Sequence, residues 1–175
     1  MSLDRLWSGW RAGYVGSAGG GSAPGSVFSA ILASGLDDSE TFIVHRGPTC
    51  FAILNAYPYS TGHMLVLPYR EVADLEQLTA DESGELWSTV TTAVAAVKRS
   101  HAPHALNVGI NLGASAGGSI SQHLHVHVVP RWEGDANFMT SVANTRTLPE
   151  ALGETHRRIV AAWPSTTAST GGAPR

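Results

Sequence analysis

The sequence predicts one α+β domain with an antiparallel sheet of five strands and one long helix between the third and fourth strands. The 175 residues suffice for one hydrophobic core. Short apolar segments of strand length recur along the chain, and a single long segment with helical periodicity separates them. The predicted strands are residues 41–46, 50–56, 63–68, 105–113 and the histidine-rich segment within 119–132.

The long helix is predicted over about residues 80–101. Thr79 followed by Glu82 forms a capping box at its start. Its apolar positions recur with helical spacing: Leu86, Val90, Ala93, Val94 and Val97. A further helix is predicted at about 149–162. We expect three parts in the chain, namely an N-terminal arm with a Gly/Ser-rich loop (1–26), the folded domain (27–163) and a disordered tail (164–175).

The composition is that of an ordinary globular protein. Apolar residues make up 43%, charged residues 14%, and the net charge is −3. A protein that binds a nucleic acid polymer usually has a basic surface, so we expect none as a partner. No apolar run reaches membrane-spanning length, and the N-terminus has no targeting pattern. Cys50, the one cysteine, is expected in the core. We expect a cytoplasmic protein that does not bind membranes.

The segment SISQHLHVHVVPRW places His123, His125 and His127 at two-residue spacing. In a strand these three side chains share one face, while Leu124, Val126 and Val128 share the opposite, core face. The histidines could form a polar sheet edge, bind a metal or supply a nucleophile. One regular strand separates its outer Cα atoms by roughly 13 Å, too far for all three histidines to hold one ion. Nucleophilic catalysis by the middle histidine is the third interpretation.

Three stretches resemble the histidine triad (HIT) family. QHLHVHVVPRW is similar to its His-φ-His-φ-His-φ-φ signature, where φ is apolar. NVGINLGASAGGSISQHLHVH resembles the family's preceding strand and glycine loop, and FAILNAYPYSTGHMLVLPYREV resembles its upstream region. The resemblance covers about residues 27–132. Within the family, GGSISQHLHVHVVPRWEGDANFM is most similar to the actinobacterial diadenosine polyphosphate phosphorylases.

The resemblance implies a HIT-like fold, a homodimer and nucleotidyl transfer at an α-phosphate. His125 is then the nucleophile, His123 orients it, and His127 contacts the phosphate or the leaving oxygen. Ser119 completes the implied catalytic set. The implied nucleotide-binding residues comprise those at the base, the ribose, the phosphates and the triad: Val27, Phe28, Ile31, Asn55, His63, Asn111, Gly118 and Ser119. The implied partners are a dinucleoside polyphosphate and inorganic phosphate.

The sequence departs from the family pattern in two places. Many members have a structural zinc site, but Ser26 and Ser29 stand here where cysteines are expected, and Glu71 stands where a histidine is frequent. Serine hydroxyls are poor zinc ligands, so we expect no metal and no cofactor. Hydrolases of the family usually have Gln at the position of Ser119. The shorter serine leaves room for phosphate as acceptor, which favours phosphorolysis.

Other functions remain open from sequence. The chain could hydrolyse the same substrates or nucleoside phosphoramidates, it could be a non-catalytic nucleotide sensor, or it could bind a metal through the strand histidines. The intact triad argues against the sensor. His45, His101, His104 and His156 have no neighbouring motif, and we expect them at the surface.

Overall fold

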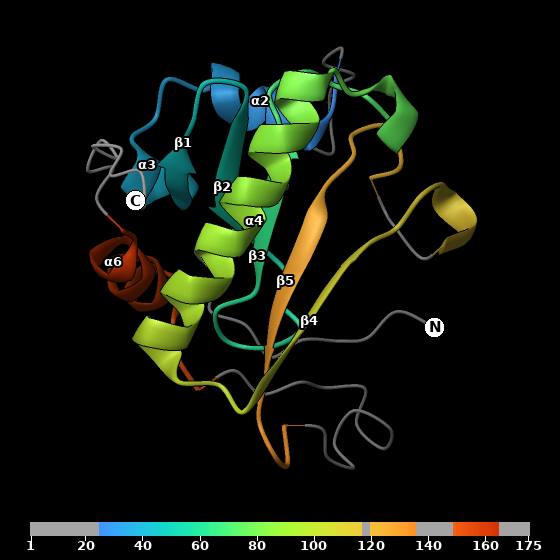
Figure 1. The fold of residues 1–175 in the computed structure, drawn as a ribbon. Coiled ribbons are helices and arrows are strands. Elements are labelled where there is room, and N and C mark those ends of the chain that lie inside the picture. Colours follow the sequence, from blue (N-terminus) through green and yellow to red (C-terminus); the bar gives the residue numbers. More distant parts are fainter. Residues whose placement is uncertain (1–24, 117–119, 136–148, 165–175) are drawn as a thin grey trace, which may run out of the picture.

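The computed structural model of the chain describes residues 25–116, 120–135 and 149–164. Five strands form one antiparallel sheet in the order β1-β2-β3-β5-β4 (Figure 1), which confirms the predicted fold class. The strands are β1 (Ile43–Arg46), β2 (Cys50–Leu54), β3 (Met64–Pro68), β4 (Ala105–Ile110) and β5 (Val126–Arg131). Most of the predicted N-terminal arm and tail lies outside the described residues.

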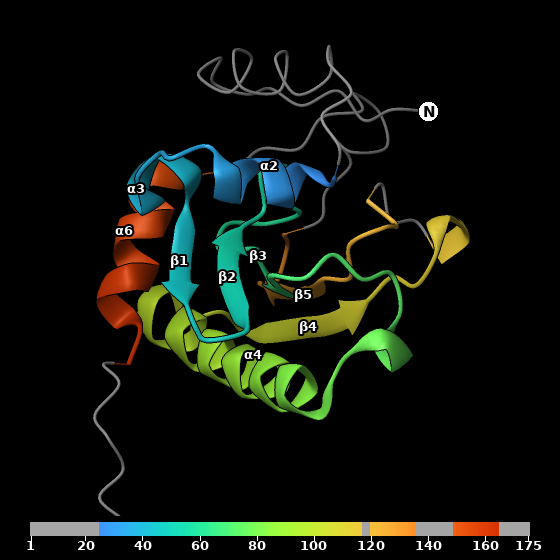
Figure 2. The same ribbon diagram turned by 90° about the horizontal axis from the view of Figure 1, so that it is seen from above.

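Helices cover both faces of the sheet. The long helix α4 (Ala80–His101) lies on one face and the short helix α2 (Val27–Ala33) on the other (Figure 2). A third helix, α6 (Leu152–Ala162), packs against α4 and β1. The smaller elements are α3 (Asp38–Thr41), η2 (Leu75–Gln77) and η3 (Ala114–Ala116). Among the described residues, no helix is long and apolar enough to cross a membrane.

Alternate strand residues build two cores, because successive side chains point to opposite faces of the sheet. The predicted core face of the histidine segment, Leu124, Val126 and Val128, is buried with Leu86 and Val97 of α4. On the other face, Phe28 and Ile31 of α2 pack against the strand residues Ile43, Phe51, Ile53, Leu65 and Leu67. Cys50 is fully buried, as expected. The sheet is thus fixed from both sides.

The predicted capping box opens α4. The Glu82 backbone N–H donates to the Thr79 hydroxyl at 3.2 Å, and the Thr79 N–H donates to the Glu82 carboxylate at 2.8 Å. Helix and prediction agree over residues 80–101. The strand predicted from residue 41 instead begins at Ile43, because α3 extends to Thr41 and Phe42 takes a left-handed conformation. α2 was not predicted, since seven residues give little periodicity.

The histidine strand begins later than predicted. The pairing of β3 with β5 ends with Val66 opposite Val126, and its continuation would place Pro68 opposite Leu124. Proline has no backbone N–H for the ladder. The Leu124 N–H donates instead to the Val72 carbonyl at 2.6 Å. His123 and His125 therefore precede β5, and only His127 belongs to the strand.

Two of the histidines expected at the surface are not there. His156 is buried on α6, and its Nε2–H donates to the Ile43 carbonyl at 2.8 Å. The His101 side chain is only 3% exposed, and its ring nitrogen lies 3.0 Å from a Glu150 oxygen. Both rings have polar partners from other elements, which is what allows a histidine to be buried. His104 is exposed and His45 is half-buried.

Candidate active site

The three motif histidines lie at the end of the sheet, beneath α2. His123 is fully buried, His125 is 7% exposed, and His127 is half-buried. The ring centroids of His125 and His127 are 4.9 Å apart. Phe28 of α2 lies 5.5 Å from both His123 and His125. The motif is thus enclosed by α2 on one side and begins in the segment just before β5, which does not pair with β3.

The position of the ring proton of His125 follows from one hydrogen bond. Its Nδ1 lies 2.7 Å from the His123 carbonyl oxygen, which can only accept, so Nδ1 holds the proton. Nε2 then carries a lone pair. Among the described residues, no group forms a hydrogen bond to Nε2, while burial lowers the pKa of the ring. A neutral, oriented imidazole with a free lone pair is a usable nucleophile.

A second chain of hydrogen bonds fixes His127. The Tyr59 backbone N–H donates to His63 Nδ1 at 3.0 Å, so His63 holds its proton on Nε2. That proton is donated to His127 Nδ1 at 2.9 Å. His127 must then hold its own proton on Nε2, which is buried and has no partner among the described residues. An unpaired buried donor is costly, and a substrate oxygen would satisfy it.

Burial keeps these rings neutral. It lowers the pKa of His127 from 6.5 to about 4, with the neighbouring His125 as a second cause. The pKa of His123 is lowered chiefly by burial as well, although the Pro68 carbonyl and Glu71 oppose the shift. At neutral pH the site therefore presents one lone pair on His125 beside one N–H donor on His127.

Acid should destabilise the fold through His127. In the folded state the His127 ring stays neutral down to about pH 4, whereas in the unfolded state it takes a proton below about pH 6.5. The stabilisation is thus fully present above pH 6.5 and is lost as the pH falls toward 4. Between pH 7 and pH 5 we expect a loss of about 2 kcal/mol from this ring, measured by urea unfolding. His127→Gln should flatten the dependence, and an unchanged slope would contradict this origin.

The other candidate residues from the sequence differ in how directly they contact the motif histidines. Phe28 contacts the triad, whereas Ile31 is 6% exposed and packed in the core with the half-buried Val27 beside it. The Asn55 side-chain oxygen accepts from the Tyr57 N–H at 2.9 Å, and its amide nitrogen lies 3.3 Å from His63. Asn111 directly follows Ile110, which pairs with Val126. Gly118 and Ser119 lie outside the described residues.

Sequence reasoning missed two contributors. The Tyr59 backbone amide sets the proton of His63, and a backbone group leaves no mark in a sequence pattern. Ser26 was noted only as a replaced cysteine, yet its hydroxyl lies 2.6 Å from His123 Nδ1. A serine immediately before an apolar helix is an N-cap signal, which could have indicated α2 but not this contact.

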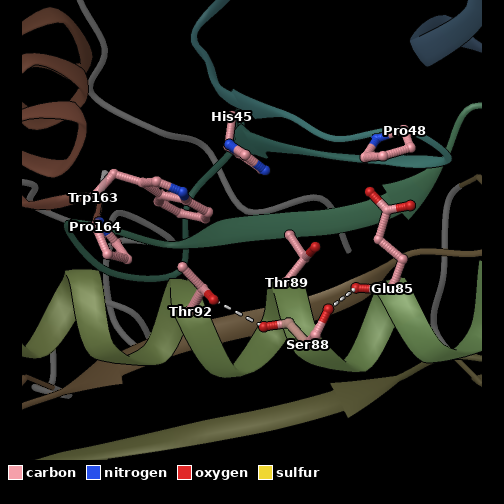
Figure 3. A pocket seen from close by; sticks show the side chains of 8 residues that line it. All are labelled: His45, Pro48, Glu85, Ser88, Thr89, Thr92, Trp163 and Pro164. Atoms are coloured by element: carbon pink, nitrogen blue, oxygen red, sulfur yellow. Dashed lines mark hydrogen bonds between the residues drawn. The ribbon is translucent and has the colours of Figure 1, made fainter. Parts of the chain in front are cut away.

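A separate pocket of about 410 Å³ lies between α4, β1 and the end of α6 (Figure 3). Its lining residues are His45, Pro48, Glu85, Ser88, Thr89, Thr92, Trp163 and Pro164. None of these is a sequence-derived site residue. His45 stacks on Trp163 with ring centroids 5.0 Å apart, while Glu85 is held by the Thr49 backbone N–H at 2.8 Å.

Comparison with known proteins identifies the family of this arrangement. The HIT domain matches residues 37–134, which include the motif histidines and His63. The chain belongs to the HIT family. A solved structure of a zinc-bound histidine triad family protein from Mycobacterium smegmatis superimposes with a TM-score of 0.63 at 27% identity, covering 78% of this chain and 91% of that one.

Two curated HIT relatives are named as enzymes. The AP-4-A phosphorylase of Mycobacterium tuberculosis is 44% identical over 167 residues, covering 92% of this chain and 85% of the relative. The asymmetrical bis(5'-nucleosyl)-tetraphosphatase of Schizosaccharomyces pombe is 33% identical over 93 residues, covering 53% of this chain and 50% of that protein. The recognition of a phosphorylase-like HIT sequence is thereby confirmed.

Proposed function

We propose that the chain is a nucleotidyl transferase that cleaves diadenosine tetraphosphate with inorganic phosphate, giving ADP and ATP. The observation that supports this most directly is the geometry of His125, whose Nδ1–H is held by the His123 carbonyl at 2.7 Å. Its opposite nitrogen is left as a nucleophile beside the His127 donor, 4.9 Å away between ring centroids. The proposed steps use side chains of the chain and require no cofactor.

The reaction has two steps. His125 Nε2 attacks an α-phosphorus, a P–N bond forms, and the P–O bond to the ATP portion breaks. His127 Nε2–H donates a hydrogen bond to that leaving oxygen and stabilises the charge that develops on it. An oxygen of phosphate then attacks the nucleotidyl-histidine, the P–N bond breaks, and ADP leaves. Neutral imidazole is a good leaving group near physiological pH, so the intermediate can be opened by a weak nucleophile.

Phosphate as acceptor is supported by similarity to the relative named AP-4-A phosphorylase over most of both chains. The serine at position 119 adds to this, as argued from the sequence. We further propose that Phe28 contacts the base with Val27 and Ile31, and that Asn55 and Asn111 bind ribose and phosphate, respectively. Gly118 and Ser119 complete the proposed phosphate contacts.

The test is product analysis with diadenosine tetraphosphate, in the presence and absence of phosphate. ADP and ATP formed only with phosphate are expected. AMP and ATP formed without phosphate would identify a hydrolase instead, an alternative favoured by the relative named as a tetraphosphatase. Tight AMP binding without any turnover would support a sensor or a phosphoramidate substrate.

We also propose a cytoplasmic homodimer. β4 forms one edge of the sheet, and all of its residues are exposed or half-buried. Val108 is 45% exposed and Leu112, just beyond the strand, is 43% exposed. An apolar edge strand of this kind favours pairing with another chain. Two copies joined along β4 would bury these side chains and extend the sheet.

Val108→Lys should shift the protein from dimer to monomer, because a lysine at an edge strand opposes strand pairing. Light scattering after size-exclusion chromatography measures the mass directly. Val160→Lys on α6 is a matched control, since Val160 is 43% exposed and lies away from β4. A wild-type protein that is monomeric at high concentration contradicts the proposal.

A further inference from the structure

A hydrogen-bonded cluster lies behind the triad, where α2, the turn after β3 and the segment before β5 meet. Its members are Ser26, Ser29, Glu71 and His123. Ser26 is 2% exposed and His123 is fully buried. Ser26 Oγ lies 2.6 Å from His123 Nδ1, and the Ser26 N–H donates to Glu71 at 2.7 Å. The Ser29 hydroxyl donates to the same Glu71 oxygen at 2.8 Å.

The direction of each hydrogen bond can be assigned. His123 Nε2 lies 2.9 Å from the Pro68 carbonyl, an acceptor, so Nε2 holds the proton. Nδ1 must then accept, and the Ser26 hydroxyl must donate to it. The Ser26 oxygen in turn accepts from the Ser29 N–H at 3.2 Å. Both ring nitrogens of His123 are therefore used, and the ring cannot rotate without losing two buried hydrogen bonds.

These residues do not fit a metal ion, although a structural relative is zinc-bound. Two ligands of a tetrahedral ion with bonds of about 2 Å lie more than about 3 Å apart. Ser26 Oγ and His123 Nδ1 are closer than that, at 2.6 Å. The lone pair of His123 Nδ1 already accepts the hydrogen bond from the Ser26 hydroxyl, and the cluster has no thiolate. Among the residues that the structure describes, no group of three His, Cys, Asp or Glu side chains is arranged to hold a metal.

The cluster bears on His125 through the backbone of His123. The His123 carbonyl is the acceptor that fixes the proton of His125, while the His123 ring is held at both ends. Phe28, two residues after Ser26, touches both rings. The start of α2 is therefore linked by direct contacts to the ring that sets the nucleophile.

We propose that Ser26 is a positioning residue. Together with Glu71 it replaces a structural metal by hydrogen bonds, and it holds His123 so that His125 keeps its reactive tautomer. The Glu71 carboxylate contributes by accepting a hydrogen bond from the Ser26 backbone N–H, which holds Ser26 in place. Loss of the Ser26 hydroxyl should leave His123 Nδ1 buried without a donor. The inference depends on His125 being the nucleophile of the proposed function, but it does not depend on the acceptor.

The test compares Ser26→Ala with Ser26→Thr, which keeps the hydroxyl, and with Ser34→Ala. Ser34 is a matched control because its hydroxyl bonds the Ile31 carbonyl at the other end of the same helix. Ser26→Ala should lower kcat by about tenfold or more with little change in KM, since an altered histidine tautomer reduces catalysis. Ser26→Thr should restore kcat, and Ser34→Ala should leave it unchanged.

A readout in the free protein separates this inference from the proposed reaction. Long-range ¹⁵N–¹H spectra of the histidine rings should show His123 Nδ1 accepting a hydrogen bond in the wild type and losing it in Ser26→Ala. The His125 tautomer should become mixed in the same variant. Unchanged ring spectra in Ser26→Ala would overturn the positioning role, whichever products the wild type forms. Stoichiometric zinc in the wild type that is lost in Ser26→Ala would overturn it as well.

Discussion

His125→Ala should lower kcat by roughly 10⁴-fold or more, since removal of a catalytic nucleophile eliminates the covalent route. The His123 carbonyl would lose its hydrogen-bond partner, and Phe28 and His127 would each lose a ring contact. The hydrogen bonds that hold the His123 and His127 rings do not involve His125. The variant should therefore fold and bind AMP with an affinity near that of the wild type. Rapid-quench assays for turnover and calorimetry for AMP binding measure the two properties separately.

His104→Ala is the appropriate control, because His104 is exposed and lies in the loop before β4. It should retain full activity. Trapping a labelled nucleotidyl group on the wild-type protein, with none on His125→Ala, would assign the covalent step. If His125→Ala kept its turnover, the proposed mechanism would be wrong. A wild-type protein that binds AMP without any turnover would be better described as a sensor.

The sequence predicted the features that depend on local pattern. Thr79 and Glu82 marked the start of α4, and the core alternation of Leu124, Val126 and Val128 is present. His156 was misplaced although the pattern was available, because Leu152, Thr155, His156 and Ile159 share the buried face of α6. A helical position between buried neighbours was a better guide to its burial than the absence of a motif.

Contacts between distant residues were beyond the sequence. Ser26 and His123 are 97 positions apart, and His63 and His127 are 64 apart. The late start of β5 is explained by Pro68, which would stand opposite Leu124 if the pairing of β3 with β5 continued, and only that pairing reveals it. The tautomers of His125 and His127 follow from backbone groups, so residue types alone cannot specify them. The family motif indicated the proposed catalytic rings, whereas the structure determines which nitrogen of each ring holds the proton.

His127→Ala should reduce kcat for diadenosine tetraphosphate by about 10²-fold or more, because the leaving oxygen loses the hydrogen-bond donor that stabilises its developing charge. The assignment rests on the Tyr59, His63 and His127 chain, which leaves the buried Nε2–H of His127 as a donor without a described partner. His127→Gln, which keeps an amide donor near this place, should recover part of the lost kcat.

The leaving group distinguishes this role from a loss of structure. In a series of substituted phenyl esters of AMP, the defect of His127→Ala should grow as the leaving phenol becomes less acidic, because a more basic leaving oxygen depends more on the donor. A variant that merely distorts the site would lose all of these reactions equally, and so would one that displaces His125. Single-turnover rates across the series therefore decide whether His127 acts on the leaving oxygen. A defect that grows in this way would also explain why a buried donor without a described partner is kept beside the nucleophile: its cost to stability is offset in the transition state, where charge develops on the departing oxygen.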